Sequence, residues 1–400
     1  MKSKTQNRGA ARLASLRKMM VNNQLDGLVF RLNHHVVMVS EYWPINGLSL
    51  VVLPLEGDPI LVAPIHDERF ARSCSIRDIR YYRWGDLEHG DPLPVTVKEL
   101  RGICDEFHLA GKRLGMELDY PLSALPAWTP EMRQWTQSAL QEIRSAFSGA
   151  TFVDTWKMLG VEASHKTAEE VAKIRVANQV GGLALKTFRE NVKAGRSEFE
   201  IAAAVEHAVH ARGPTEFGVG YAKAWAAVMS GPNSQYAGQT YNISTSRIVE
   251  KGDLVSLEMG VVADGYWTDL TRVHVAGKPS ARQQELFGWV TQAHDAAAAA
   301  VRIGVPWKEV DRAARQVIVD AKHGKYFHHH TGHGLGFCYH EIHPVIAPTT
   351  EALVEEGQMV TIEPAVYSPE WGGIRHEDVH LVTAKGSENL SPFYRGLETA

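Results

Sequence analysis

The chain is poor in cysteine, in long apolar runs and in net charge. Its three cysteines, Cys74, Cys104 and Cys338, are odd in number and widely spaced, which excludes a disulfide framework and favours a reducing cytoplasm. No apolar run approaches the roughly 18–20 residues of a membrane span, and the polar, basic first residues show no secretory signal. The net charge of −4 gives no reason to expect nucleic acid or a membrane surface as a partner.

What the chain has is the composition and length of a two-domain globular protein. It has 400 residues, of which 44% are apolar and 22% charged. Up to about residue 150, short apolar strands alternate with helical stretches, which predicts an α/β domain. Beyond it, long helices at 167–193, 198–212, 279–303 and 306–322 are separated by irregular strands, which favours α+β.

The most informative stretch lies between residues 258 and 269. Asp264-Gly265 is a strong signal for a two-residue hairpin turn, and alternating apolar residues flank it on both sides. With this turn, residue 258 pairs with 271 and residue 269 with 260, so these four positions share one face. Glu258 and Asp269 become diagonal neighbours, and a metal ion between them would relieve their repulsion. The alternative is an exposed hairpin with two solvated acids.

A second carboxylate-bearing hairpin follows toward the C-terminal end. Glu363 lies on its incoming strand and Glu377 on the strand that returns past Trp371. Between the two hairpins, histidines cluster from His323 to His343 in a glycine-rich stretch that can approach a ligand closely.

Four carboxylates with one or two imidazoles form a donor set for divalent metal ions. The set suits Mn²⁺, Co²⁺, Fe²⁺ or Zn²⁺ better than copper, and it has too little thiolate for a structural zinc site. Two such ions would lower the pKa of a shared water from about 15.7 toward neutrality, and a carboxylate or histidine could move the proton to a leaving group. We therefore expect two divalent ions, with manganese first.

These residues carry a resemblance to a known family. The motifs SGPN (230–233), DLTR (269–272), TGHGLG (331–336), IEP (362–364) and GGIRHED (372–378), in this order, resemble those of the pita-bread metallohydrolases, which include aminopeptidase P, prolidase, methionine aminopeptidase and creatinase. The resemblance implies an α+β protein, with a creatinase-type N-terminal α/β domain at 1–155 and a pita-bread catalytic domain at 156–400.

The resemblance also implies a role for each site residue. It matches the metal ligands to Glu258, Asp269, His333, Glu363 and Glu377. It assigns catalytic roles to Glu363, which would handle the proton, to His340, near the scissile bond, and to His329, which flanks the substrate pocket. Tyr367 and Arg375 match residues that orient the second glutamate and the substrate.

Two positions depart from the family pattern. Glu258 stands where the family normally has aspartate, and its extra methylene predicts weaker metal binding there. Gly238, a substrate-binding position, stands where a histidine normally contacts the peptide. The missing donor leaves space that Tyr236, Tyr241 or a bulkier substrate could fill.

The predicted function is metal-dependent hydrolysis of an amide-type C–N bond. The enzyme would resemble an Xaa-Pro dipeptidase or aminopeptidase with an altered substrate site, acting on a dipeptide or small molecule. The alternative is a creatinase-like or ectoine-hydrolase-like enzyme, or a lyase, on a small nitrogen- or sulfur-containing metabolite. A non-enzymatic binding module ranks third, because such a protein would not need Asp269, His333, Glu363, Glu377 and His340 together.

The resemblance further implies a homodimer in which residues 33–43 lie near the partner's site. From the residues alone, His34 and His35 are expected to be an ordinary loop pair, and His328 and His330 to be packing or surface residues.

Overall fold

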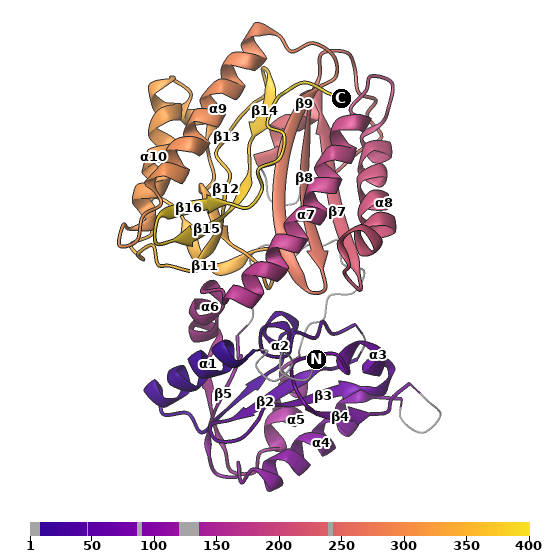
Figure 1. The fold of residues 1–400 in the computed structure, drawn as a ribbon, viewed down its shortest axis with the longest axis vertical. Coiled ribbons are helices and arrows are strands. Elements are labelled where there is room, and N and C mark those ends of the chain that lie inside the picture. Colours follow the sequence, from indigo (N-terminus) through magenta and orange to yellow (C-terminus); the bar gives the residue numbers. More distant parts are fainter. Residues whose placement is uncertain (1–8, 46, 86–89, 120–135, 239–242) are drawn as a thin grey trace. The chain divides into compact units, whose positions relative to one another are not determined.

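The computed structural model describes residues 9–45, 47–85, 90–119, 136–238 and 243–400. They form two compact units, and the chain passes from the first unit to the second between Ala163 and Ser164 (Figure 1). The domain boundary predicted from the sequence, between residues 155 and 156, stays a prediction.

A mixed sheet forms the centre of the first unit. Its strands lie in the order β4-β3-β2-β1-β5-β6. Strand β2 pairs antiparallel with β1 and β3, whereas the pairs β3–β4, β1–β5 and β5–β6 are parallel. The strands are β1 (Gly27–Phe30), β2 (Leu50–Pro54), β3 (Ile60–Pro64), β4 (Asp78–Tyr82), β5 (Arg113–Met116) and β6 (Thr151–Asp154).

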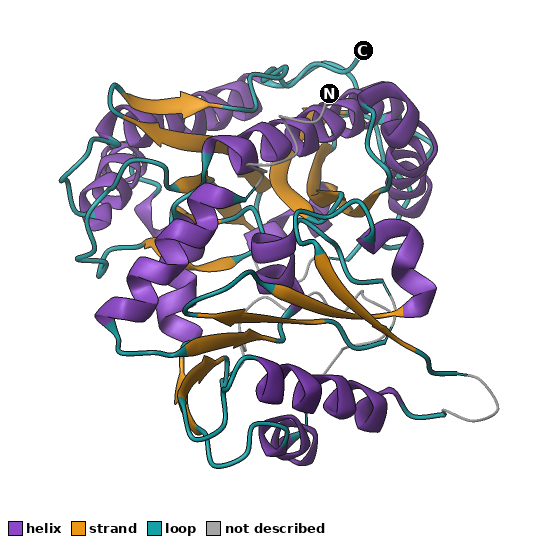
Figure 2. Cartoon of the chain, turned by 60° about the horizontal axis from the view of Figure 1, so that its bottom comes forward, coloured by secondary structure: helices purple, strands orange, loops and turns teal. Residues whose placement is uncertain are grey.

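Helices pack against this sheet, as the alternating sequence pattern predicts. Leu100 and Ile103 of α4 and Ile143 of α5 are buried in one apolar cluster with Val29 and Val52 of the strands. Figure 2 shows the helices and strands of the chain by colour. The helices of this unit are α1 (Ala10–Asn22), α2 (Asn33–Ser40), α3 (Glu68–Ala71), α4 (Pro92–Glu106), α5 (Gln137–Ser145) and α6 (Trp156–Ser164), with a 3-10 turn η2 (Ile65–Asp67).

The expectation of a loop at His34 and His35 is wrong, because both residues lie in helix α2. His35 is buried, and its Nδ1 lies 2.8 Å from Oε1 of the buried Glu117. The backbone N–H of Arg31 donates to the other oxygen of the same carboxylate at 3.0 Å. The helix was missed because it is short and has no side-chain cap, so its stability comes from these tertiary contacts.

Three sheets make up the strand framework of the second unit. The first is the antiparallel sheet β7-β8-β9, the second has the order β11-β10-β12-β15-β16, and the third is the pair β13-β14. The strands are β7 (Ala222–Ser230), β8 (Leu254–Ala263), β9 (Tyr266–Val275), β10 (Gly332–Gly334), β11 (Glu341–Ile346), β12 (Met359–Ile362), β13 (Ala365–Ser368), β14 (Gly372–Arg375), β15 (Asp378–Thr383) and β16 (Gly386–Asn389).

Two pairs of long helices cover these strands. Helices α7 (Ala168–Asn191) and α8 (Glu198–Phe217) pack along β7 to β9, while α9 (Ala281–Ala300) and α10 (Trp307–Asp320) pack together beside β11 to β16 (Figure 1). Short 3-10 turns occur at η3 (Gly231–Gly238) and η4 (Gly324–Tyr326). A capping box begins α7: the side chain of Thr167 accepts from the N–H of Glu170, whose side chain accepts from the N–H of Thr167. None of the described helices has the length and apolar character needed to cross a membrane.

Candidate metal centre

The hairpin of β8 and β9 has the predicted register. Asp264 and Gly265 form its turn with φ angles of 48° and 88°, as a two-residue turn requires. Glu258 pairs with Thr271, and Gly260 with Asp269. Glu258 and Asp269 therefore project from the same face, and both are buried, which rules out the alternative of two solvated acids.

The remaining acids and a histidine reach this face from the second sheet. His333 lies on β10, Glu363 directly follows β12, and Glu377 lies between β14 and β15. Nε2 of His333 is 3.4 Å from Oδ2 of Asp269 and 3.6 Å from Oε1 of Glu363. Nε2 of His340 is 3.5 Å from Oδ2 of Asp269. The structure thus brings all five predicted ligands and His340 together.

The donor set fits divalent metal ions. Three overlapping groups have ligand atoms within 4.8 Å of one another, namely Asp269–His333–His340, His333–Glu363–Glu377 and Glu258–Asp269–Glu377. Both carboxylate oxygens of Asp269 and Oε1 of Glu377 are buried and accept no well-formed hydrogen bond from the described part of the chain, although Nε2 of His333 lies 3.4 Å from Oδ2 of Asp269. Buried carboxylate oxygens without donors are unfavourable unless a cation is present, and oxygen with imidazole nitrogen suits such ions.

Protonation of the metal-free site follows from burial and crowding. Burial, and then the charge of Asp269, raises the pKa of Glu377 to about 7. Burial, together with the charges of Glu377 and Asp269, raises the pKa of Glu363 well above its usual range, and burial raises that of Asp269. Burial alone would lower the pKa of His333, but its interaction with Asp269 outweighs burial and the pKa is raised.

Glu258 differs from the other four predicted ligands because protein donors already contact both of its oxygens. The hydroxyl of Tyr339 donates to Oε1 at 2.6 Å. Oε2 accepts hydrogen bonds from Nη2 of Arg375 and from the hydroxyl of Thr271. A metal ion would therefore compete with three donors for this carboxylate.

Gly238 lies at the end of η3, directly against Tyr367. A Cβ atom at this position would lie 2.4 Å from the ring of Tyr367. The tyrosine ring therefore occupies the space next to residue 238. Tyr241 lies outside the described residues, and Tyr236 is half exposed, so the filling residue is one that the sequence did not indicate.

The hydroxyl of Tyr367 links His329 to Arg375. It lies 3.1 Å from Nε2 of His329 and 3.4 Å from Nη1 of Arg375. Nδ1 of His329 lies 2.7 Å from the carbonyl oxygen of His330. Burial lowers the pKa of His329 to about 4, so its ring is neutral at pH 7.

The loop that carries Gly238 is attached at both ends to Glu198, the first residue of α8. Oε1 of Glu198 accepts from the N–H of Ser230 at 2.6 Å, and Oε2 accepts from the N–H of Thr245 at 2.9 Å. The side chain of Asn233 also donates to this carboxylate, at 3.1 Å. Glu198 is fully buried, so one carboxylate positions the SGPN motif.

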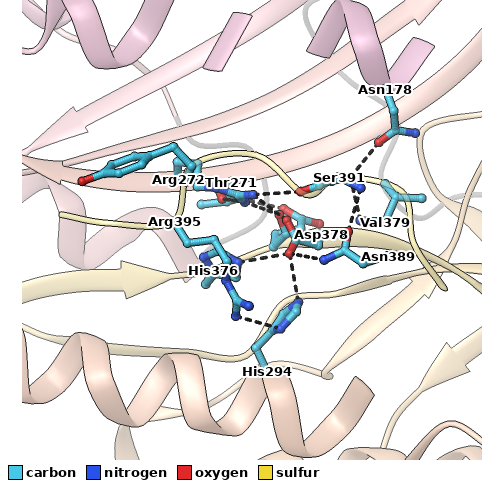
Figure 3. Close-up of polar contacts among 12 residues, drawn as sticks. Asn178, Thr271, Arg272, His294, His376, Asp378, Val379, Asn389, Ser391 and Arg395 are labelled. Atoms are coloured by element: carbon cyan, nitrogen blue, oxygen red, sulfur yellow. Dashed lines mark hydrogen bonds and ion pairs between the residues drawn. The ribbon is translucent and has the colours of Figure 1, made fainter. Parts of the chain in front are cut away.

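A separate polar network behind the metal centre surrounds Asp378. Its partners are Arg272, His294, His376 and Asn389 (Figure 3). Nη2 of Arg272 donates to Oδ1 of Asp378 at 2.5 Å, and Asn389 donates to Oδ2 at 2.8 Å. Asp378 thus accepts hydrogen bonds from protein donors, which Asp269 does not. The ligand atoms of His294, His376 and Asp378 also lie within 4.8 Å of one another, close enough to hold a metal ion. Nη1 of Arg272 donates to the carbonyl oxygen of Glu377 at 2.6 Å and so fixes the backbone beside the site.

Sequence reasoning missed Tyr339 and Thr271. The signal for Thr271 was present, because residues 269 and 271 share a face in the predicted hairpin. Tyr339 lies on an irregular loop beside His340, where no periodicity places its side chain. His330, expected to be a packing or surface residue, has a partly exposed side chain, and its Nε2 lies 3.8 Å from Oε1 of Glu363.

Comparison with known proteins identifies the family. A model described as metallopeptidase family M24 matches residues 172–384, which is more than half of the chain. The chain belongs to metallopeptidase family M24. A second model, the creatinase/prolidase N-terminal domain, matches residues 12–160. The Xaa-Pro dipeptidase of Pyrococcus horikoshii is 32% identical over 378 residues, which span 94% of this chain and 96% of that protein.

Solved structures show the same fold over both units. The prolidase from Pyrococcus horikoshii OT3 has a TM-score of 0.77 at 24% identity and covers 97% of this chain and 99% of its own. The dipeptidase PepE from Mycobacterium ulcerans has a TM-score of 0.74 at 26% identity and covers 98% of each chain. The family member described here is therefore a metal-dependent hydrolase of amide-type C–N bonds, with a creatinase-type N-terminal domain and a pita-bread catalytic domain.

The raised carboxylate pKa values predict that metal binding releases protons. The pKa of Glu377 is raised from 4.5 to about 7 in the folded metal-free protein, so its stabilising contribution is present at acid pH and is lost as pH rises through about 7. Because metal ions replace these protons, Mn²⁺ should raise the melting temperature more at about pH 8 than at about pH 6. Calorimetric titration with Mn²⁺ in two buffers of different ionisation enthalpy should show proton release near pH 6. Glu377→Gln is the control and should release fewer protons; no release from the wild type would contradict the prediction.

The contacts of Glu258 predict unequal binding of two ions. At limiting Mn²⁺, the wild type should hold about one ion tightly and a second only weakly. Glu258→Asp should increase the bound metal toward two ions per chain, because the shorter side chain cannot retain all three protein contacts. The measurement is metal analysis by mass spectrometry after equilibrium dialysis, with Tyr339→Phe as a variant that removes one contact and keeps the glutamate. Two equally tight ions in the wild type would refute this explanation.

Proposed function

We propose that this chain hydrolyses the amide bond of a small substrate or dipeptide, with chemistry close to that of Xaa-Pro dipeptidases and aminopeptidases. The observation that carries the proposal is the buried group of Asp269, His333, Glu363 and Glu377, which includes carboxylate oxygens without donors. With Glu258, these residues would hold two divalent ions. Manganese fits the oxygen-rich set best, and cobalt, iron and zinc suit the same donors.

The bound ions would supply polarisation of the scissile carbonyl and a water of lowered pKa. The chain's own residues would then manage the proton and the substrate. Glu363, a buried acid with a strongly raised pKa, is proposed to pass the catalytic proton to the leaving nitrogen. His340 faces the same centre through Asp269 and is proposed to hydrogen-bond the substrate beside the scissile bond.

The roles of His329, Tyr367 and Arg375 are proposed from their contacts. His329 contacts Tyr367, which contacts Arg375, which in turn contacts Glu258. This supports Tyr367 and Arg375 as residues that bind or orient the substrate. The catalytic role predicted for His329 would act through Tyr367, since both ring nitrogens have partners within the protein.

A second candidate is a creatinase-like or ectoine-hydrolase-like enzyme, or a lyase, on a small metabolite. The observation that favours it is that two site positions differ from the family pattern. At 258 a glutamate stands in place of an aspartate and contacts Arg375. At 238 a glycine stands in place of a histidine and lies against the ring of Tyr367. We further propose a cytoplasmic location, which the three free cysteines support.

Glu363→Gln tests the hydrolytic proposal. The variant should lose about 10²–10⁴-fold in turnover, the usual value of general acid–base catalysis, on a panel of Xaa-Pro dipeptides and small amides. Its circular dichroism and melting temperature should remain close to wild type.

Chelation should abolish wild-type activity and Mn²⁺ should restore it. Full activity after chelation would instead support a metal-free, creatinase-like mechanism.

A homodimer is the proposed assembly, with Asn33–Trp43 close to the partner's site. The proposal rests on the family resemblance and on the fixed conformation of this segment, in which His35 is paired with Glu117. Light scattering at micromolar concentration should give twice the chain mass of 44.3 kDa. A monomeric mass would count against this assembly.

A further inference from the structure

We infer that the site selects substrates without a free carboxylate beside the scissile amide, and that Tyr367 and Gly238 set this preference. The inference rests on the proposed hydrolytic function and goes further, because it names the charge class of the substrate. Three features of the second unit carry it: the direction of one hydrogen-bond chain, the contacts of Arg375, and the position of the Tyr367 ring.

The hydrogen-bond chain has a defined direction. The carbonyl oxygen of His330 only accepts, so Nδ1 of His329, 2.7 Å away, must carry the ring proton. Nε2 of the neutral ring is then an acceptor, and the hydroxyl of Tyr367, 3.1 Å away, donates to it. Arg375 donates to the same hydroxyl at 3.4 Å. The proton of Tyr367 therefore points to His329 and is unavailable to a substrate anion.

The guanidinium of Arg375 is already bound by the protein. Its Nε donates to the hydroxyl of Thr271 at 2.9 Å, and Nη1 donates to the carbonyl oxygen of Ala237 at 3.1 Å. Nη2 donates to Glu258, whose negative charge neutralises the arginine. A substrate carboxylate would have to displace Glu258 or Tyr367 to obtain the paired hydrogen bonds that arginine gives to carboxylates.

The space next to residue 238 is occupied by the aromatic ring of Tyr367, where a histidine at 238 would offer a hydrogen-bond donor. Because a Cβ at 238 would lie 2.4 Å from the Tyr367 ring, a histidine at 238 and this position of Tyr367 exclude each other. The carbon atoms of the Tyr367 ring that lie next to residue 238 offer no hydrogen-bond donor. A carboxylate placed against these ring atoms would lose hydration without gaining a donor, which costs more than the same loss for an uncharged group.

Two matched compounds test the inference. With Mn²⁺-loaded protein, kcat/KM for alanyl-prolinamide should exceed that for alanyl-proline by about tenfold or more, the value of one hydrogen bond to a charged group. Calorimetry should likewise show tighter binding of prolinamide than of proline. If neither dipeptide is cleaved, this result would count against the proposed hydrolysis of the Xaa-Pro bond. The comparison of proline with prolinamide binding would still decide the inference.

Three variants separate the contributions of the two positions. Gly238→His alone should lower the melting temperature, because the new side chain collides with Tyr367. Gly238→His with Tyr367→Ala should reverse the preference toward alanyl-proline and proline, whereas Tyr367→Ala alone, the matched control, should weaken the preference without reversing it. Equal or better use of alanyl-proline by the wild type, with proline bound at least as tightly as prolinamide, would overturn the inference.

Discussion

Mutual repulsion among four buried carboxylates is the constraint on which the second unit depends. Glu258, Asp269, Glu363 and Glu377 are each no more than 7% exposed, and a buried unpaired charge is too costly for a folded protein to keep. The unit distributes the acids over two hairpins from different sheets. Glu258 and Asp269 lie on strands β8 and β9, whereas Glu363 and Glu377 lie directly beside strands, between the paired segments of the second hairpin and not on a strand as the sequence predicted. The paired strands therefore hold all four acids at defined positions.

Cationic and neutral donors around the centre hold that arrangement. Arg375 contacts Glu258, while Arg272 pairs with Asp378 and fixes the backbone of Glu377. On the other side, the buried ion pair of Lys166 and Glu341, at 2.8 Å, anchors the strand that follows His340. These ion pairs hold the strands beside the centre in place. In contrast, both carboxylate oxygens of Asp269 and Oε1 of Glu377 accept no hydrogen bond from the described residues, so a cation would stabilise them.

Local sequence signals predicted the parts of the site that lie on regular structure. The Asp264-Gly265 turn fixed the register of β8 and β9, and alternation then placed Glu258, Asp269 and Thr271 on one face. Motif order predicted which histidine and which glutamates join them. The partners of Glu258 and the ring beside Gly238 could not be predicted in this way. Tyr339 and Tyr367 reach those places through the tertiary arrangement of loops and sheets, which no local period specifies.

The attachment of the Gly238 loop to Glu198 has a consequence for the divergence of such enzymes. Because one buried carboxylate holds Ser230 at one end and Thr245 at the other, an exposed residue between them such as Tyr236 can change while the anchor points stay in place. Insertions and substitutions are tolerated best where the flanking backbone is independently held. Recognition of a ligand can therefore change at such exposed positions while Asp269, Glu363 and Glu377 stay as they are.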